Sequence, residues 1–334
     1  MAIKAKAIQL ATRPTGAPTA ADFVEIDFEI GSPRPGQLVV ENVYLSVDPY
    51  MRELMHDGWE LNAFLTGRVL ARVLESADST LRVGDWVSHR ESWRTHALVD
   101  GADVRVLPGV DGLDVVQYLG LLGGTGLTAY VGLTRIARLQ PGETVFISAA
   151  AGGVGSAAGQ FARLLGANRI IGSTGSARKA EYLISELGFD AAFDYRNSDV
   201  SAQLAQVAPT GIDVYFDNVG SAHLEAAIDA LRERGRIAFC GAVAQYNNLA
   251  RPPCAPRNLF DLVEKSIRLE GFMVRDYYDV RDELEDFLVP HILAGRVQDV
   301  RTIVDGFDRM VEAFLGMLRG ENLGKMIVRA GDDG

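Results

Sequence analysis

The segment of residues 144–165 constrains the fold more than any other part of the chain. Its apolar, β-prone run 145–148 follows a Pro-Gly pair and predicts a buried strand. A glycine-rich turn at 150–155 comes next and leads into small and apolar residues at helical spacing. This order is the context of a dinucleotide-binding fingerprint, in which backbone N–H groups and a helix N-terminus bind a pyrophosphate. Ala150 replaces the first glycine of G-x-G-x-x-G, so a glycine turn without a ligand is the alternative interpretation.

From about residue 123 to residue 293, predicted strands alternate with predicted helices. Such alternation indicates an α/β fold with a doubly wound parallel sheet, helices on both faces and right-handed crossovers. Ligands of such sheets bind beyond the carboxyl ends of the strands. After the fingerprint, strands are expected at 169–172, 191–194, 214–217, 236–241 and 268–274, and helices at 177–187, 199–207, 223–232, 258–265 and 280–293.

The first hundred or so residues contain short strand-like runs separated by turn signals. With no helix expected between them, these runs predict a small barrel or sandwich. Within this β-rich part, Pro49 biases Asp48 toward an extended conformation, and Tyr50 follows at once. Strands are expected at 38–43, 69–74, 86–88 and 95–99, with one more at 322–328 that closes back on this part.

Length and composition limit the possible classes of protein. A chain of 334 residues suggests two domains, and 48% hydrophobic with 23% charged residues is typical of a soluble protein. The net charge of -11 argues against a nucleic-acid or anionic-membrane partner. The sequence contains no signal-peptide core and no run of transmembrane length, so we expect a cytoplasmic protein. Two cysteines and five scattered histidines leave no plausible set of zinc ligands, so no metal is expected and activity should survive chelation.

The segment after the second strand of the alternating part indicates which dinucleotide would bind. NAD enzymes usually place a carboxylate on the adenosine ribose about 20 residues past the glycines. Residues 171–179 contain no carboxylate and end in Arg178 and Lys179. Cations at a helix N-terminus oppose the helix dipole, and the 2′-phosphate of NADP would give them a reason to be there. The alternative is that both cations are solvated residues of the first helical turn.

Two side chains that follow later strands differ in what their chemistry suggests. Asn218 carries both a donor and an acceptor, which suits a ribose or a nicotinamide amide. Cys240 has no histidine nearby in sequence to activate it, and it is more typical of a small buried hydrophobic residue than of a nucleophile.

Seven motifs, taken in order, resemble one known family. They read VDPYMR, GLTAY, AAAGGVGS, GSARK, FDNVG, CGAVAQYN and NLGK. Together they resemble the zinc-independent medium-chain dehydrogenases/reductases, within the branch of leukotriene and prostaglandin reductases, plant alkenal double-bond reductases and bacterial curcumin-reductase-like proteins. The resemblance covers nearly the whole chain, although 123–126 reads GGTG where the family often has GMPG. It implies a GroES-like catalytic domain from residues 1–122 and 294–334, a Rossmann NADP-binding domain at 123–293, and usually a homodimer.

The resemblance also implies an activity and a set of site residues. The activity is NADPH-dependent reduction of the carbon–carbon double bond of an apolar enal or enone, with hydride delivered to the β-carbon. Gly152, Gly153, Val154 and Gly155 would cradle the pyrophosphate. The 2′-phosphate end would be held by Gly175, Lys179 and Tyr195. The other implied cofactor-binding residues are Pro49, Tyr50, Thr128, Asn218, Cys240, Gly241, Ala242, Tyr246, Phe272, Met273, Val274 and Asn322.

Tyr246 and Tyr50 are the candidate catalytic residues. Reduction of an enone builds negative charge on the carbonyl oxygen, so catalysis needs a hydrogen-bond donor aimed there, and the Tyr246 phenol is one candidate. Alternatively, Tyr246 only packs beside the cofactor, or a ribose hydroxyl is the donor while Tyr50 closes the pocket. Two other functions remain open: a quinone reductase of the same fold, and a nucleotide-binding regulator without turnover.

Overall fold

The computed structural model describes residues 2–247 and 255–331, which belong to two units. The β-rich unit consists of Met1–Leu119, Arg301–Asn322 and Met326–Gly334. The Rossmann unit consists of Gly120–Val300 and Leu323–Lys325. Within the described ranges, no helix has both the length and the apolar character needed to cross a membrane.

A parallel sheet of six strands forms the centre of the Rossmann unit. Its strand order is β10-β9-β8-β11-β12-β13. All of β8 is buried, as expected for a continuous apolar run in a sheet that is covered on both faces. Strand order reverses between β8 and β11, where ligands bind to such sheets. The strands are β8 Thr144–Ile147, β9 Arg169–Thr174, β10 Ala191–Asp194, β11 Ile212–Asp217, β12 Leu231–Phe239 and β13 Arg268–Gly271.

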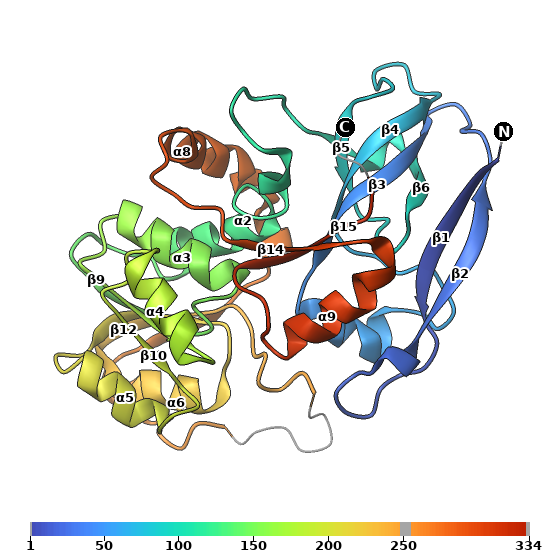
Figure 1. Ribbon diagram of the computed structural model, residues 1–334. Helices are drawn as coiled ribbons and strands as arrows, with labels where there is room; N and C mark the ends of the chain where they lie inside the picture. The colour runs from blue at the N-terminus through green and yellow to red at the C-terminus, as the bar shows by residue number, and fades with distance from the viewer. Residues whose placement is uncertain (1, 248–254, 332–334) are drawn as a thin grey trace. The chain divides into compact units, whose positions relative to one another are not determined.

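Helices connect these strands, and two of them begin at polar capping residues. The Ser176 side chain accepts from the backbone N–H of Lys179 at the start of α4, and Asp199 accepts from that of Ala202 at the start of α5. Helices α5 and α6 lie side by side, as do α2 and α3 (Figure 1). The helices are α2 Gly124–Val131, α3 Gly153–Leu164, α4 Ala177–Ser185, α5 Val200–Val207, α6 Ser221–Ala230, α7 Asp261–Glu264 and α8 Arg281–Leu293.

The predicted α/β alternation is confirmed, but several predicted ends are wrong. Strand β12 begins at Leu231 instead of residue 236, and its pairing with β11 is irregular near Ile212. The helix predicted at 258–265 shrinks to α7, and Asn258, Leu259 and Phe260 before it accept backbone hydrogen bonds from the residue three positions further along, as in turns. Strand β13 ends at Gly271, so residues 272–274 leave the sheet and lead into a 3-10 helix, Val274–Val280.

The β-rich unit contains a second, mainly antiparallel sheet of seven strands in the order β14-β15-β3-β4-β5-β7, with β6 paired to β3. The predicted closing strand is confirmed, because β15 pairs with β3 from Met326 opposite Val47 to Arg329 opposite Tyr44. These strands are β3 Gln37–Val47, β4 Val69–Ser76, β5 Trp86–His89, β6 His96–Asp100, β7 Arg105–Val106, β14 Arg301–Asp305 and β15 Lys325–Arg329.

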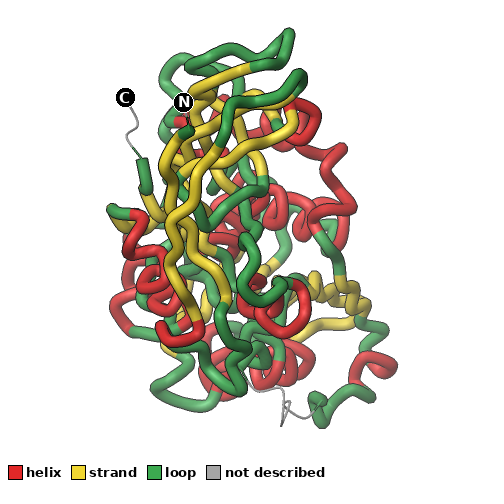
Figure 2. The backbone as a smooth tube through the Cα atoms, turned by 90° about the vertical axis from the view of Figure 1, so that its right-hand side faces the viewer, coloured by secondary structure: helices red, strands yellow, loops and turns green. Residues whose placement is uncertain are grey.

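A separate hairpin-like pair, β1 (Ile3–Leu10) and β2 (Phe23–Ile30), accompanies this sheet. The pair appears as two long yellow strands beside the N-terminus in Figure 2. Neither strand was predicted from the sequence, and neither was helix α9 (Met310–Leu318).

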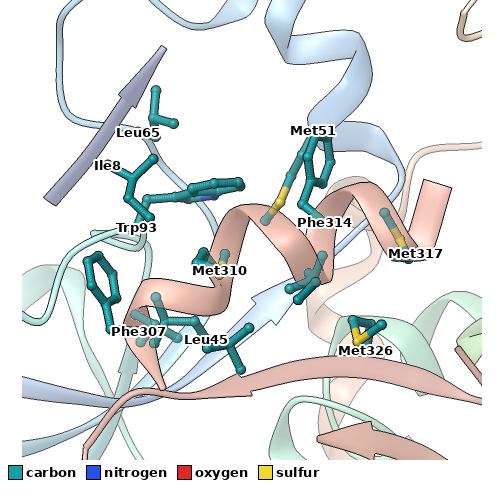
Figure 3. Close-up of a cluster of buried hydrophobic side chains, with 14 of the residues drawn as sticks. Ile8, Leu45, Met51, Leu65, Trp93, Phe307, Met310, Phe314, Met317 and Met326 are labelled. Carbon is teal, nitrogen blue, oxygen red and sulfur yellow. The ribbon is translucent and has the colours of Figure 1, made fainter. Parts of the chain in front are cut away.

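Helix α9 supplies one side of the apolar core of the β-rich unit. Met310 and Phe314 lie one turn apart on this helix and face Trp93 (Figure 3). The indole is fully buried; Phe314 meets it edge-on with ring centroids 5.7 Å apart, while Phe23 stacks on it at 5.5 Å. Such aromatic pairs add to the stabilisation that comes from burying apolar area.

The absence of helix predicted for the first hundred residues is wrong at one place. Helix α1 (Tyr50–Glu53) continues into a π-helical turn, Leu54–Gly58. Pro49 precedes it with φ -60° and ψ -32°, which the proline ring allows because its φ already matches a helical start. The buried Asp48 accepts a 2.5 Å hydrogen bond from the Ser46 hydroxyl just before this helix.

Candidate functional site

The glycine turn between β8 and α3 leaves no room for a side chain at Gly155. A β-carbon on Gly155 would lie 2.4 Å from the Ala149 carbonyl oxygen, far closer than atoms tolerate. Gly155 therefore lets α3 pack directly against the end of β8. Ala150, which replaces the first fingerprint glycine, is accommodated by the neighbouring strand β9. There, a β-carbon on Gly172 would come within 2.9 Å of the methyl group of Ala150.

The first turn of α3 presents backbone donors. Gly152 is the N-cap residue, with φ -84° and ψ 176°, and it has no side chain to cap the helix. The N–H groups of Gly153, Val154 and Gly155 point out of the helix start, where no carbonyl of the helix can reach them. Together with the helix dipole they form an anion-binding position.

A short C-terminal segment of the chain lies against this turn. The Gly324 N–H donates to the Ala151 carbonyl oxygen over 2.8 Å, and Gly324 bridges Gly152 in parallel fashion. Lys325 is 4% exposed, and its Cδ would lie 3.5 Å from a β-carbon on Gly153. The sequence interpretation noted NLGK only as a motif and did not include Lys325 among the site residues. Asn322, which it did include, precedes this segment and belongs to the β-rich unit.

The predicted residues for the 2′-phosphate end come together beyond β9 and β10. A β-carbon on Gly175 would lie 3.3 Å from Tyr195 Oη, so the phenol covers the backbone of this turn. Lys179 is in the first turn of α4, and burial lowers the pKa of its ammonium group. Arg178 is exposed on the same turn, whereas Arg196, which the sequence interpretation missed, also lies against Gly175.

His223 supports the Tyr195 ring from the first turn of α6. The two rings meet edge-on, with centroids 5.1 Å apart. Burial lowers the pKa of His223 to about 4, so the imidazole is neutral at physiological pH. A neutral aromatic ring packs against the phenol without adding charge to this end of the sheet.

The carboxyl end of β11 carries Asn218 in a fixed orientation. Its side-chain amide donates to the Ser148 carbonyl oxygen over 2.8 Å, and its backbone N–H donates to Ser148 Oγ over 2.9 Å. Ser148 directly follows β8, so these bonds join the two strands that flank the point where the strand order reverses. The side-chain oxygen of Asn218 is thereby turned away from Ser148.

Asp217 organises the same strand end from inside the sheet. Its Oδ1 accepts from Tyr215 Oη and from the backbone N–H groups of Val219 and Gly220. Burial raises the pKa of Asp217 even though these hydrogen bonds favour the carboxylate. Burial, followed by the nearby Asp217 charge, raises the pKa of Cys240 to about 12. Cys240 is therefore a thiol at neutral pH and no nucleophile.

The loop after β12 folds over the end of β11. Backbone N–H groups of Gly241 and Val243 donate to the carbonyl oxygens of Asp217 and Asn218. A β-carbon on Gly241 would lie 3.3 Å from Tyr246 Oη and 3.5 Å from the Asn218 carbonyl oxygen. The loop thus brings the phenol of Tyr246 next to Gly241 and the backbone of Asn218.

The remaining predicted residues occupy other positions. Thr128 is in α2, and its hydroxyl donates to the Gly124 carbonyl oxygen over 2.6 Å. Phe272 approaches α2 near Gly132, and Met273 is 54% exposed. The other predicted residues of this unit follow β12 and β13: Ala242 lies against Gly220, and Val274 begins the 3-10 helix.

Tyr50 belongs to the β-rich unit, where it begins α1 directly after Pro49. Burial, and then the charge of Asp48, raises the pKa of its phenol to about 12. The guanidinium of Arg68 lies 6.0 Å from the centre of the Tyr50 ring. Tyr50 is therefore protonated at neutral pH and can act only as a hydrogen-bond donor or a packing group.

Family models match one segment of each of the two units. An "N-terminal domain of oxidoreductase" model matches residues 6–107, and a "Zinc-binding dehydrogenase" model matches residues 153–289. A 2-alkenal reductase (NADP(+)-dependent) from Nicotiana tabacum is 37% identical over 97% of this chain and 96% of its own. The chain belongs to the zinc-independent branch of the medium-chain dehydrogenase/reductase family.

Two further members of this family cover almost the same length. Prostaglandin reductase 1 from Rattus norvegicus is 38% identical over 98% of this chain and 100% of its own. The crystal structure of CurA in complex with NADPH from Vibrio vulnificus has a TM-score of 0.93 and 34% identity, with 98% of this chain and 99% of CurA covered. These matches confirm the family and fold class expected from the motifs. In residues 2–247 and 255–331, no group of three or more histidine, cysteine or acidic side chains could hold a metal ion.

Proposed function

We propose that this protein is an NADPH-dependent reductase of the carbon–carbon double bond of α,β-unsaturated aldehydes and ketones. The observation that carries the proposal is the position of the Tyr246 phenol over Gly241, beside Asn218, at the carboxyl ends of β11 and β12. Parallel sheets of this order bind ligands there. The printed names of the relatives, a 2-alkenal reductase and a prostaglandin reductase, support the substrate class.

The Rossmann unit fits a dinucleotide on its own geometry. Gly155 leaves no space for a side chain, and the turn from Gly152 to Gly155 points backbone donors outward, as a pyrophosphate cradle requires. Gly175, Lys179 and Tyr195 would hold the 2′-phosphate of NADPH. The side-chain oxygen of Asn218, set by Ser148, would accept from a ribose or amide group. Bound NADPH would supply the hydride that reaches the β-carbon of the substrate.

In this proposal Tyr246 acts on the substrate oxygen. Hydride addition moves negative charge onto the carbonyl oxygen, and a phenol that donates to it stabilises the transition state more than the ground state. Asp217 keeps the loop in place by accepting the N–H groups of Val219 and Gly220, over which the loop folds. Tyr50, protonated because of its raised pKa, would close the substrate pocket.

One assay separates this proposal from its rivals. NADPH consumption is followed with an apolar enone, with a quinone, and with neither substrate. We expect rapid, enone-dependent oxidation of NADPH and recovery of the saturated ketone. Turnover with the quinone alone would identify a quinone reductase, and binding of NADPH without turnover of either substrate would identify a nucleotide-binding regulator.

We further propose a homodimer paired through β13. This strand is the last in the sheet, so one of its edges is open to another chain. Leu269 on it and Phe260 and Val263 in the segment before it are exposed, the latter two at 67% and 69%. An open strand edge flanked by exposed apolar groups favours pairing with a second copy about a two-fold axis. Light scattering at micromolar concentration would refute this by giving the mass of a monomer.

We propose that residues 1–122 and 294–334 form the catalytic domain and that residues 123–293 form the cofactor domain. We also propose a cytoplasmic enzyme that acts on small apolar molecules; the net charge of -11 argues against nucleic-acid and anionic-membrane partners. Fractionation of cells that express a tagged full-length chain would test its location.

A further inference from the structure

Arg196 extends the cationic end of the Rossmann sheet beyond the residues that the sequence indicated. It follows Tyr195 directly after β10, and its backbone N–H donates to Asp194 Oδ1 over 3.0 Å, which fixes the turn. A β-carbon on Gly175 would lie 3.4 Å from both Cζ and Nε of Arg196. The guanidinium therefore lies over the turn that follows β9.

Two side chains cover this turn, and a second cation lies in the helical turn that follows it. The Tyr195 phenol and the Arg196 guanidinium come from the end of β10, and Lys179 comes from the first turn of α4. The pKa of Lys179 is lowered first by burial and then by the positive charge of Arg196. Two cations held near each other and near a helix N-terminus repel, and both oppose the helix dipole. A dianion bound between the two cations would attract both of them and the helix N-terminus, and would offset these repulsions.

We propose that Arg196 is a second cation for the 2′-phosphate and, with Lys179 and Tyr195, determines the preference for NADPH over NADH. This inference rests on the proposed function, because it assigns a residue to the cofactor of that reaction. An arginine suits the role, since its planar guanidinium presents several donors that can bind two phosphate oxygens at once. Lysine would contribute a compact point charge from the other side.

Arg178 provides a matched control in the same region. It is also an arginine, is exposed like Arg196, and occupies the same helical turn as Lys179. Removal of either arginine changes the net charge of the protein by the same amount. A general electrostatic effect would therefore appear in both variants, whereas a direct contact with phosphate would appear only at Arg196.

The test measures binding to the full-length protein and does not depend on turnover. Arg196→Gln, Arg178→Gln and the parent are titrated by calorimetry with 2′,5′-ADP, which carries the 2′-phosphate, and with 5′-AMP, which is the same molecule without it. We expect Arg196→Gln to weaken the binding of 2′,5′-ADP by about tenfold, as for loss of a charge-assisted hydrogen bond, and to leave the affinity for 5′-AMP within twofold. Arg196→Lys should recover part of the loss, and Arg178→Gln should match the parent.

The outcomes separate this inference from the proposed function. The role of Arg196 would be overturned if Arg196→Gln weakened the binding of both nucleotides equally. It would also be overturned if the two glutamine variants had equal effects on the binding of 2′,5′-ADP. In that case the parent would still reduce an enone with NADPH. A parent that binds neither nucleotide would overturn both proposals. Circular dichroism melting confirms that each variant is folded.

Discussion

The phenol of Tyr215 donates a 2.7 Å hydrogen bond to Oδ1 of Asp217, and both residues are completely buried in the parallel sheet. The same oxygen accepts from the N–H groups of Val219 and Gly220, which form the turn that leads into α6. A single buried carboxyl group thus fixes the strand end that carries Asn218. Its other oxygen, Oδ2, has no hydrogen-bond partner among the described residues.

Asp217→Ala should lower the free energy of unfolding by roughly 3–5 kcal/mol, because several buried donors lose their acceptor. Asp217→Asn keeps one acceptor oxygen, so it should lower the free energy of unfolding by less than half as much. Urea unfolding followed by circular dichroism measures both values. A loss below about 1 kcal/mol for the alanine variant would mean that water or neighbouring carbonyl groups replace the carboxyl group.

Gly155→Ala should reduce both stability and cofactor binding. The added methyl group would meet the backbone of Ala149 at 2.4 Å, so α3 must shift, at a cost of roughly 1–3 kcal/mol. NADPH affinity should fall at least tenfold with that shift.

Gly152→Ala is the matched control for this prediction. Its added methyl group would lie 3.2 Å from the Ala149 carbonyl oxygen, and its φ of -84° suits any residue, so the free energy of unfolding should change little. NADPH affinity should still fall, because the methyl group hinders backbone approach to the pyrophosphate. Unfolding curves and NADPH fluorescence titrations measure the two effects. Identical behaviour of the two variants would contradict the separate roles given to these glycines.

Elements of the fold could be predicted from the sequence where the local residue pattern matched the burial that the structure shows. Strand β8 was predicted from an apolar run between a Pro-Gly pair and a glycine turn, and helix α4 begins at Ala177, as predicted. Strand β1 alternates exposed lysines with small apolar residues, and its pairing with β2 across a long loop leaves no local signature. The irregular start of β12 depends on the register with β11, which is a tertiary property.

The candidate site residues came from the glycine-rich motif and from the family resemblance. The sequence proposed the glycine turn and Tyr195 but not Arg196, because the approach of Arg196 to Gly175 exists only once β9 and β10 lie side by side. The space that Gly172 leaves for the methyl group of Ala150 likewise exists only in the folded sheet, where the two segments lie side by side. Contacts across neighbouring strands join positions about 20 residues apart, and no spacing rule within one segment reveals them.

Acid should destabilise the protein through two buried histidines. Burial lowers the pKa of His89 to about 3 and that of His223 to about 4, while the unfolded chain has the ordinary value of about 6.5. The unfolded state therefore binds more protons below pH 6.5, and stability falls as the pH drops toward 4. The slope should approach about 1.4 kcal/mol per pH unit for each histidine.

His223→Phe isolates one of these contributions. The phenyl ring can keep the edge-on contact with Tyr195, and His223 Nε2 has no recorded partner within the described residues. The free energy of unfolding at pH 7.5 should therefore change little, while its fall between pH 6.5 and pH 4.5 should become shallower by about 1 kcal/mol per pH unit. An unchanged pH slope in urea unfolding would show that His223 titrates normally in the folded protein.

The proposed donor role of Tyr246 leads to the sharpest kinetic prediction. Tyr246→Phe keeps the ring that lies over Gly241 and removes only the hydroxyl group. If the phenol donates to the developing enolate oxygen, kcat for a good enone should fall by roughly 10²–10³, with little change in NADPH affinity. Tyr50→Phe is the comparison, since a residue that only closes the pocket should alter KM more than kcat. A deuterium isotope effect from labelled NADPH establishes that the chemical step limits the rate. With that step limiting, a Tyr246→Phe enzyme within about threefold of the parent in kcat would assign the donor role to another group.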